Sequence, residues 1–165
     1  MAKARPIEGL RSEDPYAAAA AKVVAVRARE LADHSQDVLD VADIERVHDM
    51  RVATRRLRAA LEIFEPCFPD DQHAEALGET KAVADALGAR RDADVTIAAL
   101  ERFTEGLAAP DRPGVASLVQ QIRSEQAEAN AQLEAFVQPR RMAALSERLS
   151  ELVMEAEARV APESE

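Results

Sequence analysis

A basic segment between residues 46 and 58 holds the side chains of this sequence that are best suited to binding chemistry. It contains His48, Arg51, Arg55, Arg56 and Arg58. Arginine presents planar, fixed N–H donors that match the oxygen pairs of phosphate groups. The spacing of 3, 4 and 3 residues places His48 and the arginines 51, 55 and 58 within an arc of roughly 80° on a helix, with Arg56 to one side. The segment therefore predicts an anion-binding helical face.

The same segment predicts an apolar face on the opposite side of this helix. Its members are Met50, Ala53, Leu57, Leu61 and Phe64. No acidic residue stands between Arg51 and Arg58, and like charges four residues apart repel by about 0.2–0.5 kcal/mol per pair. Two interpretations stay open at this point. Either the arginines bind an external anion, or acidic residues of neighbouring helices neutralise them.

The length and composition of the basic segment restrict the kind of anion. Ten residues of helix span about 15 Å, which suits an extended anion better than a single phosphate. The chain has no Trp, one Tyr and four Phe, so it offers few platforms for stacking nucleobases. Its formal net charge of −10 opposes binding to duplex DNA. His48 would donate a hydrogen bond to phosphate; no convergent ligand set for a metal is expected around it.

The rest of the sequence predicts an all-α protein, an antiparallel bundle of four to five helices that positions the basic segment. Ala, Leu, Glu and Arg dominate the composition, and no strand-like alternation is present. Helices are expected at about 15–39, 43–65, 71–103, 115–137 and 139–158. The expected organisation is a flexible leader at 1–14, a single domain at 15–158 and a frayed acidic tail at 159–165.

Particular residues set the expected helix ends and the core. Asp14 and Asp43 are expected to cap the first and second helices. Pro139 is expected to kink the fourth helix or to begin a fifth. Gly78 and Gly88 interrupt the third helix, and one of them is expected to permit close packing or a kink.

An apolar seam with seven-residue spacing runs along the first helix, through Val24, Leu31 and Val38. Arg27 lies on this seam, where it either extends its charged end to solvent or faces a polar interior channel. The only cysteine, Cys67, is expected to be a small core residue.

Several classes of function lack their sequence signals. No nucleophile arrangement, zinc spacing, calcium loop or glycine-rich phosphate loop is present. We therefore expect no enzymatic activity, no metal and no cofactor. No apolar run of membrane-spanning length occurs, and the first residues do not form a signal peptide, so a cytoplasmic location is expected.

Two stretches together resemble the CHAD family, the conserved-histidine α-helical domains. The stretch VHDMRVATRRLRAALEIF resembles the signature helix of that family, and KAVADALGARRDADV, residues 81–95, resembles its second motif. The likeness is good over about residues 16–100 and rests on helical character elsewhere. The resemblance implies an all-helical fold with a basic groove or pore that binds inorganic polyphosphate, and association with polyphosphate granules.

The resemblance also implies roles for individual residues. In the signature helix, the histidine and arginines that match are His48, Arg51, Arg55, Arg56 and Arg58. Lys81 and Arg91 match basic positions of the second motif, and Arg27 fits a looser tendency of the first helix. Asp92 and Asp94 would orient arginines or cap backbone. Arg90 is additional and is expected to be solvated.

The sequence departs from the family pattern because it carries one basic motif set, whereas the family has two similar helical halves that face each other. One hypothesis is that two copies pair about a two-fold axis and rebuild the groove, so a homodimer is expected. The competing hypothesis is a structural or protein-interaction bundle with little affinity for polyanions. In that case Glu125, Glu128 or Glu134 would close over the arginines.

Overall fold

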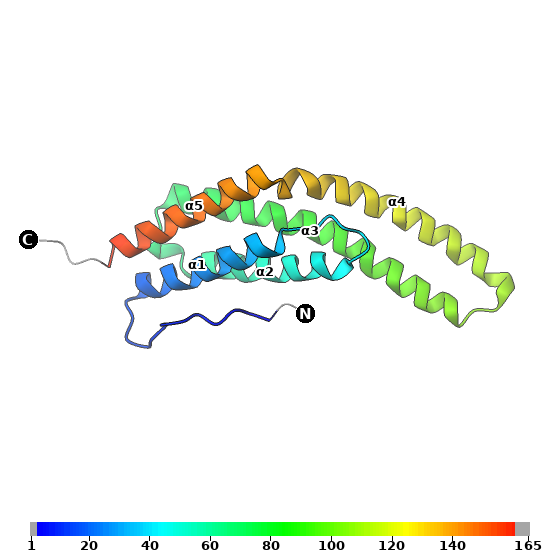
Figure 1. The fold of residues 1–165 in the computed structure, drawn as a ribbon, viewed down its shortest axis with the longest axis horizontal. Coiled ribbons are helices and arrows are strands. Elements are labelled where there is room, and N and C mark those ends of the chain that lie inside the picture. Colours follow the sequence, from blue (N-terminus) through cyan, green and yellow to red (C-terminus); the bar gives the residue numbers. More distant parts are fainter. Residues whose placement is uncertain (1–2, 161–165) are drawn as a thin grey trace, which may run out of the picture.

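The computed structural model describes residues 3–160, and these form five α-helices joined by short connections (Figure 1). In chain order the elements are α1 (Tyr16–His34), α2 (Ile44–Ile63), the 3₁₀ turn η1 (Glu65–Cys67), α3 (Asp70–Glu105), the 3₁₀ turn η2 (Ala109–Asp111), α4 (Arg112–Val137) and α5 (Pro139–Ala158). No strand occurs among residues 3–160, so the prediction of an all-α bundle is confirmed.

The helices form a four-helix bundle with a two-helix extension. α1 packs against α2 and α5, and α3 packs against α2 and α5, which closes the bundle. α3 is 36 residues long and continues past the start of α2, and α4 packs back along it. Figure 1 shows the α3–α4 hairpin extending beyond the other helices. The bundle therefore presents α2 between α1 and α3, with one of its faces outward.

The core follows the apolar pattern of the sequence. Seam residues Val24, Leu31 and Val38 are all buried, although Val38 lies in the turns that follow α1. The apolar face of α2 is buried as predicted, through Met50, Ala53, Leu57 and Leu61. Cys67 is buried as expected, and desolvation raises the pKa of its thiol, which keeps it protonated and unreactive.

The predicted ends of α1 need correction. The helix begins at Tyr16 and ends at His34, not near Leu39, and Asp37 then adopts a left-handed conformation with φ of 53°. Asp14 does not cap the helix, because its carboxylate accepts hydrogen bonds from Lys22 Nζ at 2.7 Å and from the Arg11 N–H at 3.0 Å. These partners compete successfully with the free N–H groups of the first turn.

Two other predictions about helix ends are confirmed, and the close packing expected at Gly78 or Gly88 is absent. Asp43 caps α2 by accepting the Glu45 N–H at 3.3 Å, and Pro139 begins α5. No atom outside the neighbouring helical backbone lies within 4 Å of a β-carbon built at Gly78 or Gly88. Neither glycine therefore permits close packing, and α3 continues through both.

Arg90 is the largest correction to the sequence analysis, because it is fully buried instead of solvated. Its Nε donates to Asp94 Oδ1 at 3.0 Å, and its Nη1 donates to Asn130 Oδ1 at 2.5 Å. Gln126 donates to the same Asp94 oxygen at 2.6 Å, and Asn130 donates to the carbonyl of Leu39 at 3.1 Å. This buried network joins α3, α4 and the connection between α1 and α2. Asp94 thus orients Arg90, which is not one of the arginines that the resemblance assigns to the anion.

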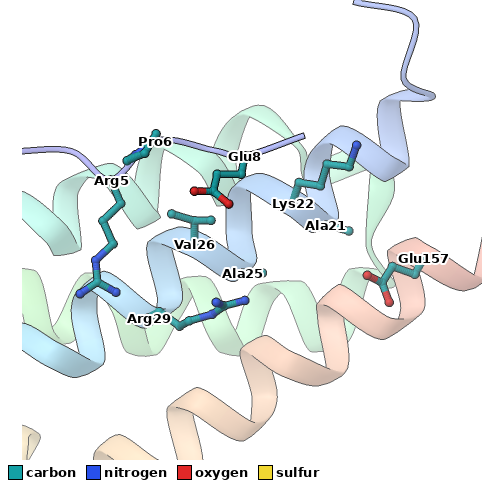
Figure 2. Close-up of a pocket in the computed structure, with 9 residues that line it drawn as sticks. All are labelled: Arg5, Pro6, Glu8, Ala21, Lys22, Ala25, Val26, Arg29 and Glu157. Atoms are coloured by element: carbon teal, nitrogen blue, oxygen red, sulfur yellow. The ribbon is translucent and has the colours of Figure 1, made fainter. Parts of the chain in front are cut away.

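The segment before α1, residues 3–14, has no helix and lies along α1; we call it the N-terminal strap (Figure 1). Arg5 contacts two acids of α1, since its backbone N–H donates to Glu30 and its guanidinium pairs with Asp33. A cavity of about 510 Å³ lies between the strap, α1 and α5, and Figure 2 shows the side chains that line it. The flexibility of residues 1–14 and the domain boundaries stay predictions, and residues 161–165 of the expected tail lie outside the described residues.

Candidate anion-binding site

The basic residues of α2 are divided between its two sides. Arg51, Arg55 and Arg58 are exposed, whereas His48 and Arg56 are half-buried. Among residues 3–160, the side chains of Arg51 and Arg55 form no hydrogen bond or ion pair. Two neighbouring turns of α2 therefore present guanidinium groups that no carboxylate of the described chain neutralises.

Arg58, at the C-terminal end of this series, shares an acid with α3. Its Nε donates to Glu62 Oε1 at 2.9 Å, and Lys81 Nζ lies 3.7 Å from the same oxygen. The hydrogen bond from Arg58, together with the charges of Arg58 and Lys81, holds the pKa of Glu62 below its usual range. All three side chains are more than 40% exposed, so water screens this cluster and an external anion can compete for its cations.

Arg91 of α3 lies at the N-terminal end of the series. Its Nη1 donates to the carbonyl of Ile44 at 3.2 Å, and its Nη2 lies 3.8 Å from Glu45 Oε1. Its side chain is only 17% exposed, so its position is well defined. Lys81 and Arg91 thus place α3 cations near the two ends of the basic series of α2. We call the whole set the cationic face: His48, Arg51, Arg55, Arg58, Lys81 and Arg91.

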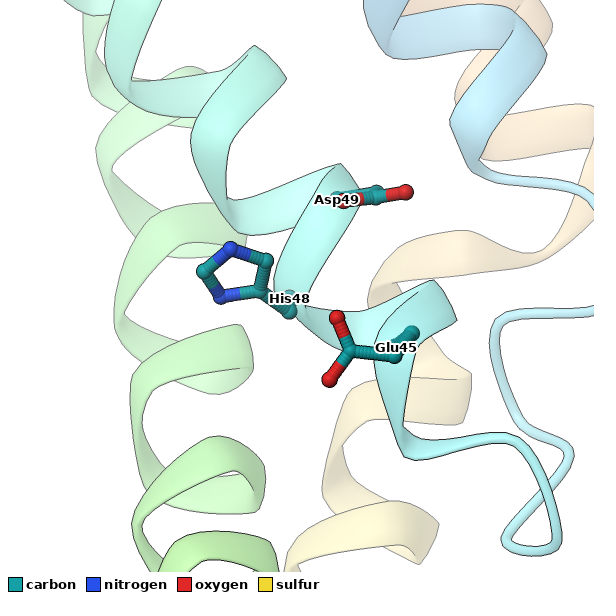
Figure 3. A group of neighbouring side chains, drawn as sticks. All are labelled: Glu45, His48 and Asp49. Atoms are coloured by element: carbon teal, nitrogen blue, oxygen red, sulfur yellow. The ribbon is translucent and has the colours of Figure 1, made fainter. Parts of the chain in front are cut away.

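His48 has acidic neighbours that the sequence analysis does not expect. Ligand atoms of Glu45, His48 and Asp49 lie within 4.8 Å of one another on the first turns of α2, and Figure 3 shows His48 and Asp49 leaving the helix in different directions. The spacing of three and four residues could have indicated this group. A cation placed there would also lie close to the guanidinium of Arg91, which disfavours it.

Arg56 lies on the side of α2 that faces α1, and there it approaches Arg27 and Glu30 of α1. Arg27 Nη1 donates to Glu30 Oε2 at 2.7 Å, and Arg56 Nη1 lies 3.9 Å from Glu30 Oε1. Arg27 therefore neither extends freely into solvent nor lines an interior channel, but pairs with a buried acid. Glu125, Glu128 and Glu134 lie on α4, which packs along α3, and the ion pairs seen here use Glu30 and Glu62.

The sequence analysis missed both acids that organise these arginines. Glu62 follows Arg58 by four residues and Glu30 follows Arg27 by three, which are the spacings of helical ion pairs. A search for acids beyond the segment from Arg51 to Arg58 would have found them. The contact between Arg56 and Glu30 joins two helices, so no local spacing could have indicated it.

A comparison with protein families decides what this arrangement represents. The CHAD domain profile matches residues 22–165, which is most of the chain and extends through the C-terminal helices. The chain belongs to the CHAD domain family. Domains of this family are known in general for binding polyphosphate and are generally binding domains, not catalytic ones. No curated protein matches the sequence.

Among residues 3–160, no helix is both long and apolar enough to cross a membrane. The match begins at residue 22, so the whole N-terminal strap and residues 16–21 of α1 lie outside it. The basic series of α2 and both α3 cations lie inside it.

Proposed function

We propose that this protein is a non-catalytic module that binds inorganic polyphosphate, or a similar multivalent phosphate, on its cationic face. The observation that carries the proposal is that Arg51 and Arg55 are exposed and have no acidic partner in residues 3–160, with Lys81 and Arg91 flanking them from α3. Charge-assisted hydrogen bonds of this kind contribute roughly 1.5–3 kcal/mol each.

The shape of the cationic face supports an extended ligand. From His48 to Arg58 the series follows ten residues of helix, or about 15 Å. Phosphate units that repeat along a chain can contact several arginines at once, whereas a single phosphate cannot. The chain as a whole carries a net charge of −10, so affinity has to come from this local arrangement of donors. Association with polyphosphate granules would follow from such binding.

The competing function is a structural or protein-interaction bundle with internally neutralised arginines. The ion pairs of Arg56 with Glu30 and of Arg58 with Glu62 favour it in part. Neutralisation is incomplete, however, because Arg51 and Arg55 have no acidic partner among residues 3–160. Repulsion between these two arginines is an unfavourable feature that an external anion would relieve.

A homodimer would complete the site, and we include it in the proposal. Each chain presents one cationic face, at the surface of α2 and α3, and a second copy related by a two-fold axis could place its own face opposite. Sizing by light scattering at tens of micromolar tests this arrangement. A protein that remains strictly monomeric with and without polyphosphate would contradict it.

Titration with long-chain polyphosphate at low and moderate salt tests the proposed function. We expect binding that weakens steeply with salt, because each phosphate contact releases counterions. Orthophosphate and duplex DNA serve as comparison ligands and are expected to bind far more weakly. Absence of polyphosphate binding at low salt would remove the proposal and favour the protein-interaction alternative.

A further inference from the structure

Glu30 is the most deeply buried acid near the basic helix, and it joins three parts of the chain. It is fully buried on α1. Its Oε1 accepts the backbone N–H of Arg5 at 2.5 Å, and its Oε2 accepts Arg27 Nη1 at 2.7 Å. Arg56 of α2 lies 3.9 Å from Oε1. Arg27 Nη1 also donates to the carbonyl of Arg5 at 3.2 Å, so the strap is held by both members of an ion pair.

The charges around Glu30 keep it ionised. Burial alone would raise the pKa of its carboxyl, but the Arg5 N–H, Arg27 and Arg56 together hold that pKa below its ordinary value. The charge of Glu30 thus lies close to two guanidinium groups that are mostly buried, since the side chains of Arg27 and Arg56 are 13% and 28% exposed. A buried arginine that loses such a partner is strongly unfavourable, which restricts where these two side chains can go.

The position of these residues separates them from the cationic face. On a helical wheel Arg56 lies about 100° from Arg55 and on the side of α2 that faces α1. Lys81 and Arg91 mark the other side, which faces α3. The strap lies along α1 on the side of Glu30, where Figure 2 shows Arg5 and Glu8 beside the helix.

We propose that Glu30 is a specificity-determining residue that withholds Arg27 and Arg56 from the anion and so sets the α1 border of the cationic face. The inference rests on the proposed function and reduces the set of arginines that contact the polyphosphate. Polyphosphate contacts the arginines on the α3 side of α2. The adjacent arginine Arg56, although it belongs to the same basic run, serves to join α2 to α1 and the strap.

A comparison of two neighbouring arginines tests this division in the full chain. Arg55→Gln and Arg56→Gln remove the same charge from adjacent positions, and each variant is titrated with long-chain polyphosphate over a range of salt concentrations. We expect Arg55→Gln to weaken binding several-fold. The slope of log K against log salt should become shallower, with its magnitude reduced by roughly 0.7. Arg56→Gln is expected to leave that slope unchanged. Equal reductions in the two variants would overturn the inference.

A substitution of the acid provides the converse test. Glu30→Gln keeps the shape of the side chain but no longer compensates Arg27 and Arg56, so Arg56 is expected to turn outward along α2. Binding should become tighter and more dependent on salt, although the protein is less stable. A variant that folds but binds polyphosphate with the same or a lower salt slope would contradict the inference.

Asp33→Asn is the matched control for that substitution. Asp33 is on the same helix and pairs with the Arg5 guanidinium, and it is exposed. Loss of the Asp33 charge should loosen the strap without changing the salt slope of polyphosphate binding. If Asp33→Asn steepened that slope as much as Glu30→Gln, the strap or the net charge would explain the result, and the inference would fail. If the wild-type chain binds no polyphosphate, the proposed function fails; if it binds and Arg56→Gln behaves like Arg55→Gln, this inference alone fails.

Discussion

At the level of single residues, acidic partners divide the arginines into two groups. Arg27, Arg56 and Arg90 are held by buried acids, whereas Arg51 and Arg55 have none among residues 3–160. The sequence could predict which residues share a helical face, because that depends only on spacing. It could not predict the burial of Arg90, because Asn130 and Leu39, which satisfy its network, lie 40 or more residues away from it.

Arg55→Ala should separate binding from folding. The side chain is exposed and repels Arg51 one turn away, so its removal is expected to change the free energy of unfolding by less than about 0.5 kcal/mol, in the stabilising direction. Urea unfolding measures this. A loss of several kcal/mol would show that Arg55 has a structural partner and is not held ready for an anion.

The depressed pKa of Glu30 predicts how stability depends on pH. Because the folded chain lowers this pKa below its ordinary value of 4.5, the unfolded chain binds the proton more readily. The contribution of Glu30 is therefore complete well above pH 4.5 and is lost as the pH falls through the lowered pKa of the folded chain. Glu30→Gln should reduce the free energy of unfolding at pH 7 by up to about 3 kcal/mol. It should also make that free energy fall less steeply as the pH is lowered. Urea unfolding of the wild type and of Glu30→Gln across this pH range measures the difference. If the two free energies of unfolding fell in parallel with pH, the role of Glu30 would be contradicted.

At the level of elements, local signals predicted most helix boundaries and failed where tertiary contacts compete. Asp43 can cap α2 because its two oxygens are used separately: Oδ1 accepts the Glu45 N–H, and Oδ2 lies 3.2 Å from Arg46 Nε. Asp14 looked equally suitable, but Lys22 occupies its oxygen. The end of α1 was predicted too late because the apolar period continues through Val38, which is buried from a turn and not from a helix.

Gly78 offers a stabilising substitution in α3. A β-carbon at this position meets no atom within 4 Å, and the residue lies inside a long helix. Gly78→Ala is therefore expected to raise the free energy of unfolding by about 0.5–1 kcal/mol, mainly by restricting the unfolded chain. Thermal or urea unfolding would show this increase. A decrease would indicate a close contact at Gly78 that the structure does not contain.

The α3–α4 hairpin should depend on the buried network around Arg90. Asp94→Ala leaves the buried guanidinium of Arg90 without its carboxylate, and we expect a loss of about 3–5 kcal/mol. Asp92→Ala, two residues earlier and exposed, is the matched control and should change stability by no more than about 0.5 kcal/mol. Hydrogen exchange in α4 should rise in the first variant alone. Similar losses in the two variants would contradict the role assigned to this network.

At the level of the whole molecule, a cationic face stands on an acidic protein. The net charge of −10 repels nucleic acids at long range, while the fixed donors of α2 and α3 act over a few ångströms. The sequence alone predicted this contrast between a basic helix and an acidic chain, and the two motifs predicted the family. The sequence could not reveal that α3 would place Lys81 and Arg91 near the two ends of the basic series, because that depends on the register between two packed helices.

The most direct test of the central claim is the salt dependence of polyphosphate binding to the wild-type chain and to the double variant Arg51→Gln/Arg55→Gln. Both proteins should fold equally well, because neither arginine has a partner among residues 3–160. We expect salt-sensitive binding by the wild type. In the double variant the magnitude of the slope of log K against log salt should be smaller by roughly 0.7 for each arginine removed. Equal slopes and equal affinities would show that the cationic face does not hold the phosphate chain.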